Sequence, residues 1–104
     1  MVIYRQWQEY LPHIPKSIRY TVGHKIDALF VEIIENLFIA SFLPAHEKLP
    51  YLKKAATKLD LAQFFLQICW EVKGLEIKRY VHLATQLIEI GKMLGGWIKQ
   101  IAGL

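Results

Sequence analysis

Apolar residues recur along most of this chain at the three- and four-residue spacing of an α-helix. Between Val22 and Leu37 they fall on one helical face, while Lys25 and Glu32 fall outside it. No stretch alternates apolar and polar residues over the length of a β-strand. The pattern therefore predicts an all-α protein.

The first half of the chain contains the signals for two helices. A short helix is expected from about residue 4 to residue 11, because Pro12 and Pro15 follow it and cannot continue it. Ser17 is a suitable N-cap for a second helix. The apolar periodicity carries this second helix to Phe42.

The second half contains the signals for two more helices. After a loop over residues 43–48, Pro50 suits the first turn of a third helix, which ends near Gly74 in the usual C-terminal cap position. A fourth helix is expected over residues 76–99, followed by a short apolar tail. Long helices joined by short loops predict an antiparallel up-down four-helix bundle.

The composition indicates one domain over residues 1–104 with more apolar surface than a small monomer buries. Hydrophobic residues make up 54% of the chain and charged residues 21%. Residues 61–70 are apolar on nearly every side apart from Gln63 and Gln67, which predicts that this segment is buried all round. Because soluble monomers seldom expose large apolar patches, the excess predicts a homo-oligomer.

The same composition bears on the compartment. The longest charge-free apolar runs, such as residues 37–45, are far shorter than the roughly 18–20 residues of a membrane span, so no membrane association is expected. The first residues lack the pattern of a signal peptide. Cys69 is the only cysteine and lies in an apolar segment, which favours a buried thiol and a cytoplasmic protein.

No catalytic, cofactor-binding or metal-binding signature is found in the sequence. Glu32 and Glu35 share a helical face, but a di-iron bundle also requires Glu-x-x-His motifs, and none occurs. We interpret these two carboxylates as part of a solvated face. His24 and Asp27 are neighbours at helical spacing, and without a nearby nucleophile we interpret them as a hydrogen-bonded surface pair.

Basic residues are the main candidates for function. The formal net charge is +4, a mild bias towards acidic partners such as nucleic acid. Several of these cations lie close to expected helix starts, where phosphates are favoured. The alternative is a solvated face that keeps an apolar protein soluble. The candidate nucleic-acid and partner-binding residues are Lys16, Arg19, Lys25, Lys53, Lys54, Lys58, Lys78 and Arg79.

The fourth helix carries glycines that a helix normally avoids, because each costs about 1 kcal/mol relative to alanine. Such glycines leave room for close approach of another helix. Trp70 and Trp97 lie in apolar stripes, which favours core or interface packing over base stacking. The candidate oligomer-interface residues are Gly91, Met93, Leu94, Gly95, Gly96 and Trp97.

Two blocks of sequence are specific in combination. The first is PKSIRYTVGHKID at residues 15–27, and the second is KRYVHLATQLIEIGKMLGGWIK at residues 78–99. Together they resemble the accessory variability determinant (Avd) family of diversity-generating retroelements. The resemblance extends over about residues 4–99. This family is similar to the four-helix-bundle proteins encoded in intervening sequences of bacterial 23S ribosomal RNA genes.

The resemblance implies a barrel-shaped homopentamer that is not itself an enzyme. Such proteins bind the retroelement's reverse transcriptase and help it copy a template RNA into mutagenised complementary DNA. The implied partners are therefore the reverse transcriptase, RNA and DNA, with no cofactor. By position, Lys16, Arg19 and Lys25 resemble the family's basic block on the second helix. Lys78, Arg79 and Lys92 resemble its polar or basic face on the fourth.

One departure from the family bears on nucleic-acid binding. The family often has arginine at the positions of Gln63 and Gln67, so two cations are missing from each subunit here. A stand-alone homo-oligomeric interaction protein of the ribosomal intervening-sequence type, without a polymerase partner, is the alternative function. An enzyme with a metal site on the bundle is a second alternative, which the missing Glu-x-x-His motif opposes.

Overall fold

A computed structural model describes residues 1–103. Its elements are α1 (Val2–Tyr10), a 3₁₀ turn η1 (Leu11–His13), α2 (Lys16–Ile18), a π-helical turn η2 (Arg19–Gly23), α3 (His24–Phe42), α4 (Ala45–Glu71) and α5 (Ile77–Ala102). Because α2, η2 and α3 follow one another without a break, they form one long rod. Residues 1–103 contain no strand, which confirms the predicted all-α class.

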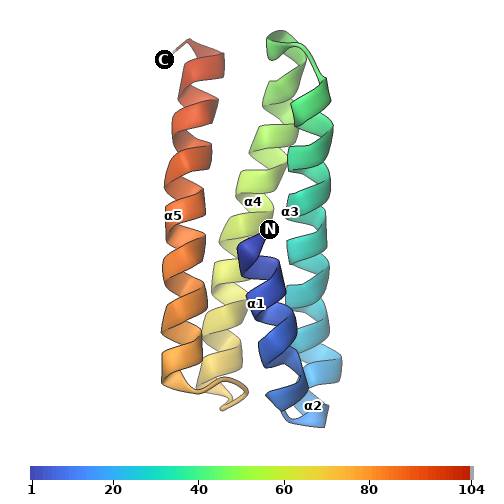
Figure 1. The fold of residues 1–104 in the computed structure, drawn as a ribbon, viewed down its shortest axis with the longest axis vertical. Helices are drawn as coiled ribbons and strands as arrows, with labels where there is room; N and C mark the ends of the chain where they lie inside the picture. The colour runs from blue at the N-terminus through green and yellow to red at the C-terminus, as the bar shows by residue number, and fades with distance from the viewer. Residues whose placement is uncertain (104) are drawn as a thin grey trace.

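Four helical rods form an elongated up-down bundle of 44 × 20 × 19 Å. The α2–α3 rod, α4 and α5 run most of its length, with α4 in contact with both of the others. The short α1 packs between α3 and α5 and covers only the lower part of the bundle (Figure 1). The structure thus confirms a four-helix bundle whose fourth position is only partly filled.

The helix boundaries differ from the expected ones at several places. The second rod begins at Lys16 with Pro15 at its N-cap, so Ser17 is inside the helix and caps nothing. The fourth helix runs to Ala102, beyond residue 99, so most of the expected tail is helical; residue 104 lies outside the described residues. Gly103, with φ of 76°, ends this helix in the left-handed conformation that glycine adopts easily.

The expected loop over residues 43–48 is mostly helix. Pro44 is the N-cap of α4, and the amide of Glu47 donates to its carbonyl at 2.9 Å. Pro50 is therefore inside α4 and not in its first turn. It removes one donor from the helix, which leaves the carbonyl of His46 without its usual partner four residues on. The glutamate in the first turn favours the early start, because the positive end of the helix dipole lies there.

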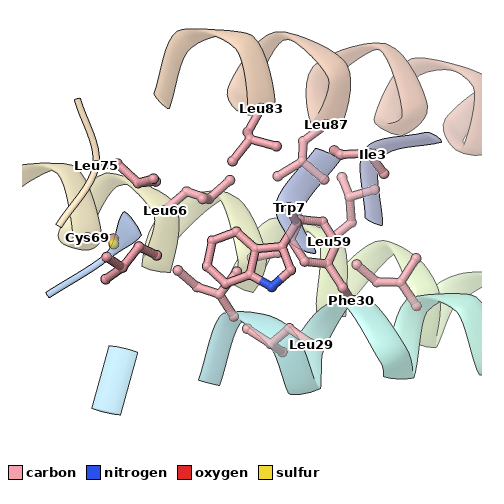
Figure 2. Close-up of a cluster of buried hydrophobic side chains, with 14 residues drawn as sticks. Ile3, Trp7, Leu29, Phe30, Leu59, Leu66, Cys69, Leu75, Leu83 and Leu87 are labelled. Carbon is pink, nitrogen blue, oxygen red and sulfur yellow. The ribbon is translucent and has the colours of Figure 1, made fainter. Parts of the chain in front are cut away.

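The core divides into a lower and an upper cluster. In the lower cluster, Trp7 of α1 is fully buried among residues of all the rods, including Leu29, Phe30 and Leu66 (Figure 2). The upper cluster consists of Ala40, Leu52, Ala55 and Leu94, with Trp97 packed against it. Since α1 does not reach this end, the upper core is built from three rods only.

Asp27 attaches α1 to α3. Its Oδ1 accepts hydrogen bonds from Trp7 Nε1 at 3.0 Å and from Gln8 Nε2 at 2.7 Å. Burial raises the pKa of the Tyr4 hydroxyl, and the Asp27 carboxylate raises it further. The expected His24–Asp27 pair is wrong, because Asp27 faces α1 and satisfies the indole N–H that a buried tryptophan brings with it.

Gly74 allows the α4–α5 turn to pass close to the core. A Cβ atom at this position would lie 2.7 Å from Cys69 Sγ and 3.0 Å from the Cys69 carbonyl oxygen. Its own amide donates to that carbonyl at 2.7 Å. The left-handed residue of this turn is Lys73, with φ of 65°, so Gly74 is needed for its lack of a side chain and not for its backbone conformation.

Gly74→Ala is expected to lower the free energy of unfolding by about 1–3 kcal/mol, the usual cost of overpacking. Gly23→Ala is the matched control. Gly23 has an ordinary helical φ of −60°, and a Cβ there would make only normal contacts at 3.6–3.8 Å. The control is expected to gain about 0.4–1 kcal/mol. Urea denaturation followed by circular dichroism measures both, and equal effects would contradict this account of the turn.

Cys69 is fully buried, as its apolar sequence setting predicts. Burial raises the pKa of its thiol from 9.0 to about 11. The unfolded chain ionises first as the pH rises, so the stabilisation from this thiol is complete below the unfolded pKa and is lost between about pH 9 and pH 11. The loss is at most about 1.4 kcal/mol per pH unit. Denaturation at several pH values is expected to give a shallower pH dependence for Cys69→Ala than for the parent, and identical slopes would contradict the assignment.

Candidate nucleic-acid and partner interface

Two pairs of cations that are far apart in sequence lie at the same end of the bundle, here called the basic end: Lys16 and Arg19, with Lys78 and Arg79. Lys16 is the first residue of α2, and Lys78 is the second residue of α5. Both helices begin at the lower end of the bundle in Figure 1. The up-down topology therefore brings together residues that the sequence separates by about sixty positions.

The two arginines of the basic end also hold the chain together. Arg19 donates from Nε and Nη2 to the Ile14 carbonyl and from Nη2 to the Pro12 carbonyl, at 3.0–3.2 Å. The Arg79 guanidinium lies 5.3 Å from the centre of the Tyr10 ring. The hydrogen bonds of Arg19 fix the turn that follows α1. The contact of Arg79 with Tyr10 holds the C-terminal end of α1 against α5. The lysines Lys16 and Lys78 are exposed, so they are the cations of this end best placed to meet phosphate.

The positive ends of two helix dipoles add to the charge of the basic end. Neither α2 nor α5 has an acidic residue in its first turn. Their first N–H groups therefore favour a bound anion. Glu76, the N-cap of α5, opposes this effect on one side.

An aromatic pair lies where α4 and α5 meet near the same end. The rings of Trp70 and Tyr80 stack at 5.3 Å with an interplanar angle of 9°. Trp70 is 39% exposed, so it is not part of the core of one subunit, and its packing at an interface stays a prediction. The expectation for Trp97 is confirmed, since it packs against the upper core. A stacked, partly exposed aromatic pair is a surface on which a base can stack.

The remaining basic candidates do not join the basic end. Lys58 forms an ion pair with Glu32 at 3.2 Å, which ties α4 to α3. Lys25 lies 6.0 Å from the ring centre of Phe65, and Lys54 lies 5.3 Å from that of Tyr51. Lys53 is exposed on α4. These side chains are spread along the bundle.

An open groove of about 280 Å³ runs between α4 and α5, here called the α4–α5 groove. Its lining residues are Asp60, Gln63, Phe64, Gln67, Tyr80, Ala84 and Ile88. Gln63 and Gln67 both lie in it, and Gln67 Nε2 donates to Glu71 Oε1 at 3.0 Å. Phe64 is 57% exposed. The prediction that residues 61–70 are buried all round is therefore wrong for one subunit.

The structure separates the candidate interface residues of α5. Leu94 belongs to the upper core, and Met93 and Trp97 line a second groove on the α3 side. A Cβ at Gly91 would lie 3.3 Å from Leu59 Cδ2, whereas one at Gly95 or Gly96 would meet nothing within 4 Å. Gly91 and Gly95 follow Ile88 by three and seven residues, so they extend the α4–α5 groove along the same face.

An aromatic ridge on α3 is another exposed apolar surface. It consists of Val31, Phe38 and Phe42, whose spacing places them on one face. The rings of Phe38 and Phe42 lie 4.9 Å apart at 65°. Phe38 is 63% exposed and Phe42 is 74% exposed. None of these three residues is among the candidates predicted from the sequence.

Comparison with known protein families identifies the family of this chain. A family model described as bAvd-like matches residues 2–101, nearly the whole chain. The chain belongs to the bAvd-like family. This confirms the resemblance to the accessory variability determinant proteins. Neither a curated protein nor a solved structure matches the chain.

Two kinds of feature are absent from the described residues of this bAvd-like chain. Within residues 1–103, no three His, Cys, Asp or Glu side chains gather closely enough to hold a metal ion. No described helix combines the length and the apolar character that crossing a bilayer requires.

Proposed function

We propose that this bAvd-like protein is a non-enzymatic, cytoplasmic accessory factor of a diversity-generating retroelement. It binds the reverse transcriptase and the template RNA or its complementary DNA, and it supports mutagenic reverse transcription. The family match over residues 2–101 carries this proposal. Accessory proteins of this type act by binding, so the surfaces of the bundle are where the function resides.

The basic end supports the nucleic-acid part of the proposal. Lys16 and Lys78 are exposed beside two helix N-termini, and the Trp70–Tyr80 stack lies near them. Cations supply the electrostatic term in nucleic-acid binding, and aromatic faces add stacking that tolerates any base. Because these features repeat in each subunit, an oligomer multiplies the charge that a single chain presents.

The exposed apolar surfaces support assembly into the family's homopentamer. The aromatic ridge lies on α3, and the α4–α5 groove lies between two other helices, so no residue belongs to both surfaces. Contacts between two different apolar surfaces are heterologous, and they generate a ring where the rotation from one subunit to the next closes. In this proposal the ridge residues Phe38 and Phe42 of one subunit pack on the groove of the next, beside Gly91 and Gly95.

The functional test is complementary DNA synthesis on the template RNA by the reverse transcriptase encoded nearest to this chain. The proposal predicts that adding this protein raises the yield of complementary DNA containing substitutions at template adenines. An unrelated basic four-helix protein at equal concentration is the control. Equal yields with both proteins would contradict the proposal and favour a stand-alone interaction protein.

A further inference from the structure

The fourth position of the bundle is empty over several turns. Tyr10 Oη lies 2.8 Å from His82 Nδ1, and α1 runs antiparallel to α5, so Val2 is level with about Ile90. At about 1.5 Å per residue, α5 continues for about 18 Å from there to Ala102. Figure 1 shows no helix beside this upper part of α5 on the side of α1. The missing length corresponds to about three helical turns.

An apolar groove, here called the α3–α5 groove, begins above the N-terminal end of α1. It has a volume of about 160 Å³ and is lined by Leu37, Ile90, Met93, Leu94 and Trp97. Leu37 follows Ile33 of the lower core by one turn of α3, and Ile90 follows Leu87 by one turn of α5. The groove is therefore the continuation of the surface on which α1 is already packed. Met93 at its edge is 69% exposed.

We propose that the α3–α5 groove binds one amphipathic helix of about three turns from a partner protein. Its apolar side chains occur at i, i+3 or i+4, and i+7, and it carries acidic residues near its ends. The apolar surface is continuous along α3 and α5: a helix, α1, covers its lower part, and the same kind of lining continues above it. The inference is independent of the nucleic-acid binding and the ring proposed above.

The charges at the two ends of the groove favour an acidic helix. Lys48 Nζ lies 5.8 Å from the ring centre of Trp97, at the upper end, and donates to the Ala40 carbonyl at 2.6 Å. At the lower end is the start of α1, which has no acidic residue in its first turn and no side-chain cap. An ammonium group and the positive end of a helix dipole both attract carboxylates.

A second copy of this chain does not offer such a helix. Each of its long helices already buries one face in its own bundle. Its α1 is held by the bonds of Trp7 and Gln8 to Asp27 and by the contact of Tyr10 with His82. A groove one helix wide accepts a single isolated helix, whereas a second bundle presents a surface that is too broad to enter it.

The probe is a synthetic, fluorescently labelled helical peptide of about 14 residues. It carries leucine at i, i+3, i+4 and i+7, with glutamates in its end turns, and its binding to the full chain alone is measured by anisotropy. The inference predicts saturable binding that Met93→Glu weakens at least about tenfold, because the new carboxylate lies among apolar side chains and repels the peptide. Val81→Glu is the matched control, since Val81 is also exposed on α5 but does not line the groove. This control is expected to bind as the parent does.

Further outcomes decide the question. A peptide with lysine in place of its glutamates is expected to bind several-fold more weakly at low salt, and equal binding would overturn the charge argument. If Met93→Glu leaves the binding of the peptide unchanged, the peptide does not bind in the α3–α5 groove and the proposed site is wrong. If the parent binds no peptide and Met93→Glu alone reduces the mass of the protein in solution, the groove is covered by a second copy and the proposal is wrong. Both variants replace exposed side chains, so a circular dichroism spectrum of the parent type is expected for each.

Discussion

Replacing Gly95 by leucine is expected to dissociate the oligomer while leaving the subunit folded. A Cβ at Gly95 meets nothing within 4 Å in its own chain, so the new side chain projects from the subunit at the end of the α4–α5 groove. Leucine also favours the helix over glycine, by somewhat less than the roughly 0.8–1 kcal/mol that separates alanine from glycine. At a subunit contact the same bulk costs about 1–3 kcal/mol, which weakens the contact by about fivefold to 150-fold. Sedimentation velocity measures the mass, and circular dichroism measures the fold.

Two controls separate assembly from folding. Gly91→Leu is expected to weaken the subunit as well, because its Cβ would already lie 3.3 Å from Leu59 Cδ2. Lys92→Leu places the same leucine side chain at an exposed position on another face of α5 and is expected to keep the parent's mass. A Gly95→Leu protein that also keeps the parent's mass would refute the proposed interface.

The double variant Lys16→Glu/Lys78→Glu is expected to bind RNA at least about tenfold more weakly at 0.1 M salt. Each phosphate contact contributes about 0.7 to the slope of log affinity against log salt on single strands and about 0.9 on B-form duplex DNA. Losing two contacts per bound subunit therefore lowers this slope by about 1.4 on single-stranded RNA. Fluorescence anisotropy with a labelled RNA over a series of salt concentrations gives both the affinity and the slope.

The matched control is Lys53→Glu/Lys54→Glu, which reverses two exposed charges on α4, away from the basic end. This control is expected to leave the slope nearly unchanged. Arg19 is left in place, since its hydrogen bonds to the Pro12 and Ile14 carbonyls make any variant there a test of folding as well. If the Lys16/Lys78 variant keeps the parent's slope, these lysines only solvate the surface.

The apolar periodicity was sufficient to predict the bundle, because each long helix must bury one continuous face. It was less informative about the ends of helices. Ser17 and Pro50 both have the residue type of a helix start, but Pro15 and Pro44 begin the helices earlier. A proline inside a helix costs one hydrogen bond, and the packing of α4 against its neighbours outweighs that cost.

The contents of the fourth position could not be predicted from sequence. Trp7 is the central side chain of the lower core, and its only local signal is the spacing of four from Ile3. Its partner Asp27 is twenty residues away, and only the docking of α1 onto α3 brings them together. The sequence therefore indicated the first helix without showing how little of the bundle it covers.

The candidate site, like the fold, could be predicted from the sequence only in part. The basic residues were found by type and by their proximity to helix starts, but only the topology brings Lys16 and Lys78 to one end of the bundle and leaves Lys53 away from it. Glycines and large apolar side chains on α5 were correctly identified as unusual. Their division between two grooves and the upper core depends on how α5 is rotated against α3 and α4.

Co-purification tests the central claim most directly. This chain is expressed with the reverse transcriptase encoded nearest to it, and the two are passed together over a size-exclusion column at moderate salt. The account predicts that they co-elute as a stable complex with more than one copy of this chain per polymerase. Clean separation, with this chain intact and oligomeric, would contradict the accessory role and support a stand-alone interaction protein.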